Sequence, residues 1–137
     1  MVTVTEVEQL IELYGQGLQI KYVDDMPDKL SGIIVGHTIY MNSNLHDWES
    51  YCTLAEEFGH YYTGTRHNIT NYCSNHDIKE ESTARRWGYQ ALIPYSRLKE
   101  FLKGKETVAI YDIAEEFRVP NDVVQNVIEY YKCKGKL

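Results

Sequence analysis

The hydrophobic residues of this chain change their period near residue 46. Residues 4–14 have a helical pattern. The hydrophobic residues then alternate as in β-strands over residues 18–23, 32–36 and 38–42. After residue 46, their spacing is helical almost throughout. We therefore expect an α+β fold, in which an N-terminal helix precedes a three-stranded, mostly antiparallel sheet and several helices follow.

The helical part divides into segments at proline, glycine and polar residues. The pattern predicts helices over roughly residues 46–62, 78–93 and 96–103, and two more within 108–131, separated by Val119-Pro120-Asn121. A polar, Asn-rich loop, residues 64–77, separates the first two. We expect two domains, a main domain over residues 1–104 and a helical C-terminal extension over residues 105–137.

The charge balance limits the partners of the chain. Fourteen Lys and Arg residues against twenty Asp and Glu give a net charge of −6, whereas unaided binding of nucleic acid needs a basic face. No apolar run approaches the about 20 residues that cross a bilayer, and the N-terminus lacks the features of a signal peptide. Three cysteines without CxxC spacing argue against a disulfide framework. We expect a cytoplasmic protein that is not bound to a membrane.

The helix over residues 46–62 carries side chains that could bind a metal. At about 100° per residue, Glu56 and His60 lie on adjacent turns, and Glu57 can point at the same space from the side. A metal hydrolase needs two such ligands and a carboxylate that accepts a proton from water. The alternative is a solvated face on which Glu56 and His60 form a weak pair. The two lie at the edge of an apolar arc that comprises Trp48, Tyr51, Cys52, Ala55, Phe58, Gly59 and Tyr62.

The helix over residues 78–93 offers a third ligand. Glu81 lies in a stripe of small and apolar residues that continues with Ala84, Gly88 and Leu92. A carboxylate in such a stripe is costly unless it is paired or binds a metal. The small residues allow tight helix packing, as Gly59 does on the other helix, and would bring Glu81 towards His60. The alternative is an ion pair from Glu81 to Arg85 or Arg86.

Two motifs, AEEFGHYY at residues 55–62 and ESTARRWGYQALIP at residues 81–94, together resemble the ImmA/IrrE family of metallopeptidase-like proteins. Phages and integrative elements of bacteria encode these proteins. The family pattern is HExxH on one helix, followed on the next by a glutamate, an alanine three residues later and an ending near Leu-Leu-x-Pro. The resemblance covers about residues 1–100 and implies a small zincin-like domain. It implies that His60 and Glu81 are zinc ligands and that Glu57 is the catalytic general base.

The chain departs from this pattern at position 56, where glutamate replaces the first histidine (EExxH for HExxH). A His/His/Glu set leaves a Zn²⁺ site with one positive charge, whereas a Glu/His/Glu set leaves it formally neutral. A less positive ion lowers the pKa of its bound water less, and added oxygen ligation favours harder ions such as Mn²⁺. Because Glu56 keeps a ligand-capable oxygen, we expect Glu56, His60 and Glu81 to bind zinc, with Mn²⁺ as an alternative.

The resemblance implies a zinc metallo-endopeptidase, encoded by a phage or mobile element, that acts in the bacterial cytoplasm. Its substrate would be a helix-turn-helix repressor, whose cleavage, with Glu57 activating the metal-bound water, derepresses the genes of the element. The alternative function, favoured by the substitution at position 56, is an anti-repressor that binds its partner without cleaving it.

Two further features carry weaker predictions. His67 and His76 lie between the two motif helices and are secondary candidates for metal binding. Residues 108–128 resemble a helix-turn-helix, but the second helix offers a polar and acidic set, Asp122, Gln125, Asn126 and Glu129. This surface argues against direct DNA binding, and we interpret the segment as a helical cap or protein-docking surface.

Overall fold

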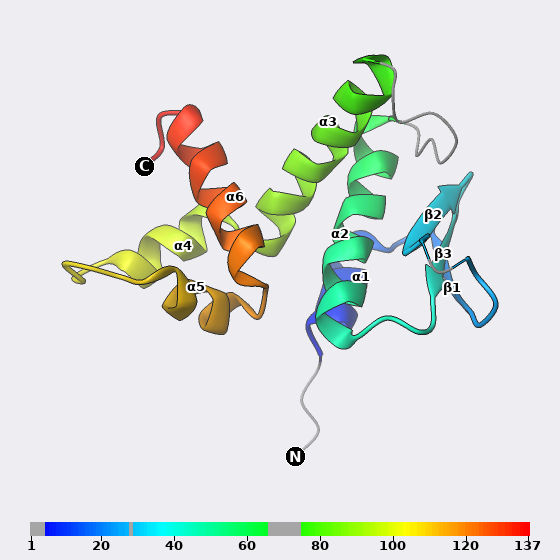
Figure 1. Ribbon diagram of the computed structural model, residues 1–137, viewed down its shortest axis with the longest axis horizontal. Helices are drawn as coiled ribbons and strands as arrows, with labels where there is room; N and C mark the ends of the chain where they lie inside the picture. Colours follow the sequence, from blue (N-terminus) through cyan, green and yellow to red (C-terminus); the bar gives the residue numbers. More distant parts are fainter. Residues whose placement is uncertain (1–4, 28, 66–74) are drawn as a thin grey trace. The chain divides into compact units, whose positions relative to one another are not determined.

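A computed structural model describes residues 5–27, 29–65 and 75–137, and their side chains except those of residues 75–78. It confirms the α+β class, with six helices and a three-stranded sheet in the described residues. The chain divides into two compact units, Met1–Gly88 and Tyr89–Leu137, which are described here one at a time (Figure 1). The division expected at residue 104 stays a prediction.

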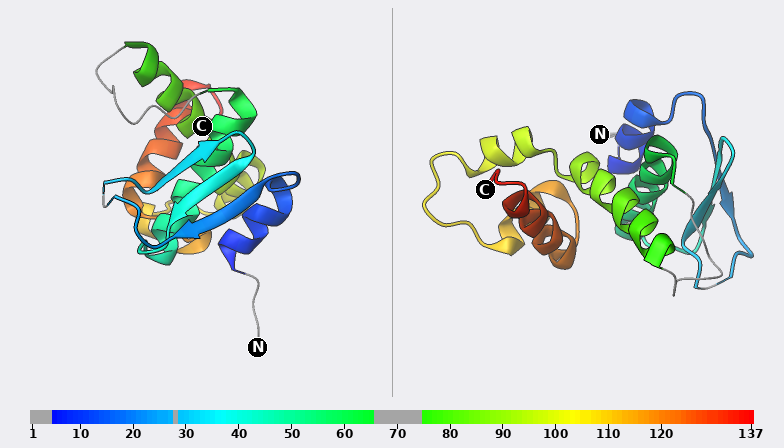
Figure 2. Two further views of the ribbon diagram at one scale, coloured as in Figure 1. Left: turned by 90° about the vertical axis from the view of Figure 1, so that its right-hand side faces the viewer. Right: turned by 90° about the horizontal axis from the view of Figure 1, so that it is seen from above.

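The first unit is a sheet covered by helices. In chain order it contains α1 (Glu6–Tyr14), β1 (Gln19–Val23), β2 (Gly32–Val35), β3 (Thr38–Asn42), α2 (Asp47–Thr63) and most of α3 (Asn75–Leu92). The helices of this unit lie on one face of the sheet (Figure 2). Thr5 caps α1 through a hydrogen bond from the Glu8 amide.

The sheet has the strand order β1-β3-β2. Strands β2 and β3 form an antiparallel hairpin, whose turn contains Gly36 at a φ of 62°. Strand β1, however, pairs with β3 in parallel, so the sheet is mixed rather than mostly antiparallel. After β1 the chain crosses to the opposite edge of the sheet and forms β2 there. It then turns back, and β3 lies between the two edge strands, parallel to β1. Both β1 and β2 are edge strands.

Helix α2 is the centre of the first unit. The predicted apolar arc is confirmed for Tyr51, Ala55, Phe58 and Gly59, which are buried. Leu54, Glu57 and His60 are buried as well, because α2 is covered by the sheet on one side and by helices on the other. Trp48 and Tyr62, which share this arc by helical spacing, are 51% and 45% exposed and so do not belong to the core. Trp48 belongs to the first turn, and Tyr62 stacks its ring on Trp87.

The second unit is helical. It holds the end of α3 and then α4 (Tyr95–Leu102), α5 (Ile110–Phe117) and α6 (Asn121–Cys133). Buried Tyr131 of α6 donates a hydrogen bond to the Ile93 carbonyl at 2.6 Å. Arg118, in the left-handed region at a φ of 58°, ends α5. The predicted break between the last two helices is therefore present at residues 118–120. None of the described helices is both long and apolar enough to span a membrane.

Candidate metal centre

The site depends on a close approach of α2 and α3. A Cβ atom added to Gly59 would lie 2.2 Å from the carbonyl oxygen of Ala84. About one turn after Ala84 on α3, a Cβ atom added to Gly88 would lie 3.3 Å from the carbonyl oxygen of Ala55. Only small residues permit this contact between two helix backbones. The packing predicted from the stripe of small residues is therefore present.

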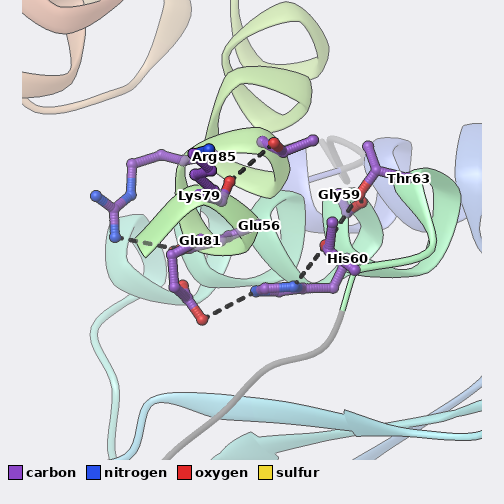
Figure 3. Close-up of polar contacts among 9 residues, drawn as sticks. Glu56, Gly59, His60, Thr63, Lys79, Glu81 and Arg85 are labelled. Atoms are coloured by element: carbon purple, nitrogen blue, oxygen red, sulfur yellow. Dashed lines mark hydrogen bonds and ion pairs between the residues drawn. The ribbon is translucent and has the colours of Figure 1, made fainter. Parts of the chain in front are cut away.

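This contact brings together the three residues that the sequence singled out. Ligand-capable atoms of Glu56, His60 and Glu81 all lie within 4.8 Å of one another. His60 Nε2 and Glu81 Oε1 are 3.4 Å apart (Figure 3), which is about the separation of two ligands around tetrahedral zinc, roughly 3.4 Å. His60 and Glu81 are 1% and 9% exposed, while Glu56 is partly exposed. The donor set and its spacing thus fit a divalent ion.

The imidazole of His60 is oriented by a threonine. His60 Nδ1 lies 2.9 Å from Thr65 Oγ1, and Thr65 Oγ1 lies 3.0 Å from Thr63 Oγ1. Thr63 in turn donates a hydrogen bond to the Gly59 carbonyl at 2.6 Å. In the tautomer in which Nδ1 carries the proton and donates a hydrogen bond to Thr65 Oγ1, the lone pair of Nε2 faces Glu81 and is available to a metal.

Sequence reasoning missed this role of Thr65. The residue becomes a neighbour of His60 because Gly64, in the left-handed region at a φ of 71°, ends α2 and turns the chain back. The signal in the sequence was the glycine that follows the last turn of the motif helix, with a hydroxyl residue directly after it.

The acidity of Glu56 is changed by its surroundings. Its pKa is raised from 4.5 to about 7. Burial is the main cause, the positive charge of Arg85 opposes it, and nearby Glu81 and Glu57 add to it. Arg85 Nη2 lies 3.4 Å from Glu56 Oε1. The sequence offered an ion pair between Glu81 and Arg85 as the alternative to metal binding, whereas the ion pair that the structure gives Arg85 is with Glu56. Two carboxylates side by side stabilise a shared proton or a bound cation.

The proposed base, Glu57, follows Glu56 on α2 and is 1% exposed. It lies close enough to Glu56 for its negative charge to raise the pKa of that residue. Its role in catalysis stays a prediction. His67 lies outside the described residues, as does the side chain of His76, so their predicted roles stay open too.

A hollow of about 430 Å³ opens next to His60. Residues 33–36, at the end of β2 and in the following turn, form one side of it. His60, Tyr61, Gly64 and Thr65, from the end of α2, form the other. The hollow therefore connects the metal-binding group with an edge strand of the sheet.

Comparison with protein families gives a match. The model of the IrrE N-terminal-like domain, Peptidase_M78, matches residues 15–129. The match includes α2 and α3, which carry the candidate site, and extends through α4 and α5 into α6. It therefore reaches beyond residue 100, where the resemblance found in the sequence ends. No curated protein matches the chain.

Proposed function

The chain belongs to the IrrE N-terminal-like (Peptidase_M78) family, and from this premise we propose that it is a zinc-dependent peptidase-like protein. The observation that carries the proposal is the convergence of Glu56, His60 and Glu81 within 4.8 Å. His60 would bind the ion through Nε2, and the two glutamates through one carboxylate oxygen each. Zn²⁺ suits this mixed nitrogen and oxygen set, and Mn²⁺ is the alternative that two carboxylates favour.

The chemistry of a bound divalent ion would be that of a Lewis acid, which polarises the peptide carbonyl and makes water a better nucleophile. In this proposal Glu57 accepts a proton from the attacking water as the new carbon–oxygen bond forms. It then delivers that proton to the amide nitrogen as the carbon–nitrogen bond breaks. Burial of Glu57, which is 1% exposed, supports this role, since a buried carboxylate is held in a fixed place and is little solvated.

The substrate would bind as an extended segment. Strand β2 is an edge strand, and the hollow beside it leads to His60. An edge strand presents backbone groups that can pair with another extended chain. A peptide paired with β2 would therefore run past His60 with its backbone held in place.

The partner follows from the family resemblance of the two motifs. We propose a helix-turn-helix repressor of a phage or mobile element, which this protein meets in the bacterial cytoplasm. Cleavage would derepress the genes of that element. The net charge of −6 supports a protein partner over direct binding to DNA.

The first test is the metal content of the protein, purified without chelator and without added zinc. We expect about one zinc per chain, lost in the His60→Ala and Glu81→Ala variants. No metal in the wild-type protein, even after zinc and manganese are supplied, would contradict the proposal. The second test is cleavage of the cognate repressor, which Glu57→Gln should abolish while metal binding persists.

A second candidate function is anti-repression without turnover, in which the fold binds the repressor. The glutamate at position 56 favours it, because a neutral site activates water less than a positive one. Derepression that survives Glu57→Gln in cells would identify this function and exclude the peptidase mechanism.

A further inference from the structure

A cation lies against the one ligand that departs from the family pattern. Arg85 Nη2 is 3.4 Å from Glu56 Oε1 (Figure 3). Arg85 is one helical turn after Glu81 on α3, so that both project towards α2. Glu81 reaches His60, while Arg85 reaches Glu56. One face of α3 thus supplies both a candidate metal ligand and a positive charge to the same site.

The geometry allows Glu56 to serve both partners. A carboxylate has two oxygens and can accept from Arg85 with one while it binds an ion with the other. The Glu56 side chain is 27% exposed and that of Arg85 53%. The guanidinium therefore lies on the outer side of Glu56, away from buried His60 and Glu81.

We propose that Arg85 is a charge-compensating residue of the metal site. Two carboxylates and one histidine around a divalent ion sum to zero charge, and the guanidinium of Arg85 restores one positive charge. The site then has the net charge of a His/His/Glu site, although Glu56 has replaced a histidine. This inference rests on the proposed function, because it concerns the same ion.

The neighbouring residue Arg86 has the same charge as Arg85 but a different partner. Arg86 Nη2 lies 3.3 Å from Thr83 Oγ1, on its own helix. The guanidinium of Arg86 therefore contacts a residue of α3 itself, whereas that of Arg85 contacts Glu56 of α2. Arg86 consequently provides a matched control, with the same side chain and the same charge one residue away.

The two possible roles of Arg85, charge compensation and structural support, predict different effects of its removal on metal affinity. A cation near the site repels a divalent ion and draws electron density from Glu56, so its removal should tighten metal binding. If Arg85 only held the fold or the Glu56 rotamer, its removal would weaken binding or leave it unchanged. The direction of the change therefore separates the two roles.

The experiment measures Zn²⁺ affinity by competition with a chromogenic chelator at about pH 8.5, so that protons compete little with the ion. We expect Arg85→Met to bind Zn²⁺ about tenfold more tightly than the wild type. Arg85→Lys, which keeps the charge, should stay within about threefold of the wild type, as should Arg86→Met. In the Glu56→Gln background, which removes the partner of Arg85, the effect of Arg85→Met should fall below about threefold.

The outcomes distinguish the two proposals. If wild-type protein binds no divalent ion, the proposed function fails and this inference fails with it. If the wild type binds Zn²⁺ but Arg85→Met binds it equally or more weakly, only the role of Arg85 is overturned. An equal tightening in Arg86→Met, or in Arg85→Met combined with Glu56→Gln, would also overturn it, because the effect would then be one of overall charge. Circular dichroism of each variant checks that the exposed substitution leaves the fold intact.

Discussion

The missing Cβ of Gly59 would lie 2.2 Å from the carbonyl oxygen of Ala84. This contact between backbones is what places Glu81 of α3 3.4 Å from His60 of α2. Gly59 lies just before His60 in the motif, and Ala84 lies three residues after Glu81. The residues that set the distance between the helices are thus interleaved with those that would bind the ion.

Gly59→Ala should therefore damage the site without changing any ligand. The added methyl group collides with backbone, which cannot rotate away, so α3 has to move. We expect a loss of about 1–3 kcal/mol in the free energy of unfolding, measured by urea denaturation, and weaker binding of Zn²⁺. Gly88→Ala is the graded control, because its Cβ would meet the Ala55 carbonyl oxygen at 3.3 Å and should disturb the protein less. Equal metal affinity in Gly59→Ala and wild type would show that the site does not depend on this contact.

Much of this site could be predicted from the sequence because it depends on helical periodicity. The spacing of four residues puts Glu56 and His60 on adjacent turns, and the small residues at positions 59, 84 and 88 indicate close helix packing. Both features are local and leave a regular pattern. The three predicted strands and the break after α5 are signalled in the same way, by alternation and by turn residues.

What the sequence could not provide are pairings between distant segments. The parallel pairing of β1 with β3 depends on a crossing of the chain that alternation does not record. The sequence offers a pair of Arg85 with Glu81 on the same helix only as an alternative, whereas the contact of Arg85 with Glu56 depends on the rotation of α3 against α2. Exposure of Trp48 and Tyr62 likewise depends on where the cover of α2 ends.

Thr65 should be needed for metal affinity although it is not a ligand. Its hydroxyl oxygen lies 2.9 Å from His60 Nδ1 and would hold the tautomer whose Nε2 can bind an ion. Thr65→Val removes the acceptor at nearly constant volume, and we expect Zn²⁺ affinity to fall about 10- to 100-fold. Thr65→Ser keeps the hydroxyl and should restore most of the affinity in the same chelator competition. Loss of affinity in both variants to the same degree would indicate that packing of the methyl group, and not the hydrogen bond, is responsible.

The pH dependence of metal binding should carry a contribution from Glu56. Its pKa, raised by burial to about 7, means that a proton occupies the carboxyl group below that pH and has to leave before an ion binds. We therefore expect the affinity of the wild type, divided by that of Glu56→Gln, to rise about tenfold per pH unit up to pH 7 and then to level off. Isothermal titration calorimetry at several pH values provides this ratio. A ratio that does not change with pH would mean that Glu56 does not release a proton to the ion.

Removal of the metal should destabilise the protein, because the three ligands come from two helices. Glu56 and His60 lie on α2 and Glu81 on α3, so an unfolded chain does not hold them together and the ion binds the folded state. At a free metal concentration about 100 times the dissociation constant, this linkage contributes about 2.7 kcal/mol. For a chain of this size we expect a rise of the melting temperature of roughly 5–15 °C, measured by differential scanning calorimetry with and without chelator. In His60→Ala the difference between the two scans should disappear. A shift of the same size in that variant would place the stabilising ion at another site, since the imidazole of His60 is the one nitrogen ligand of the group formed by Glu56, His60 and Glu81.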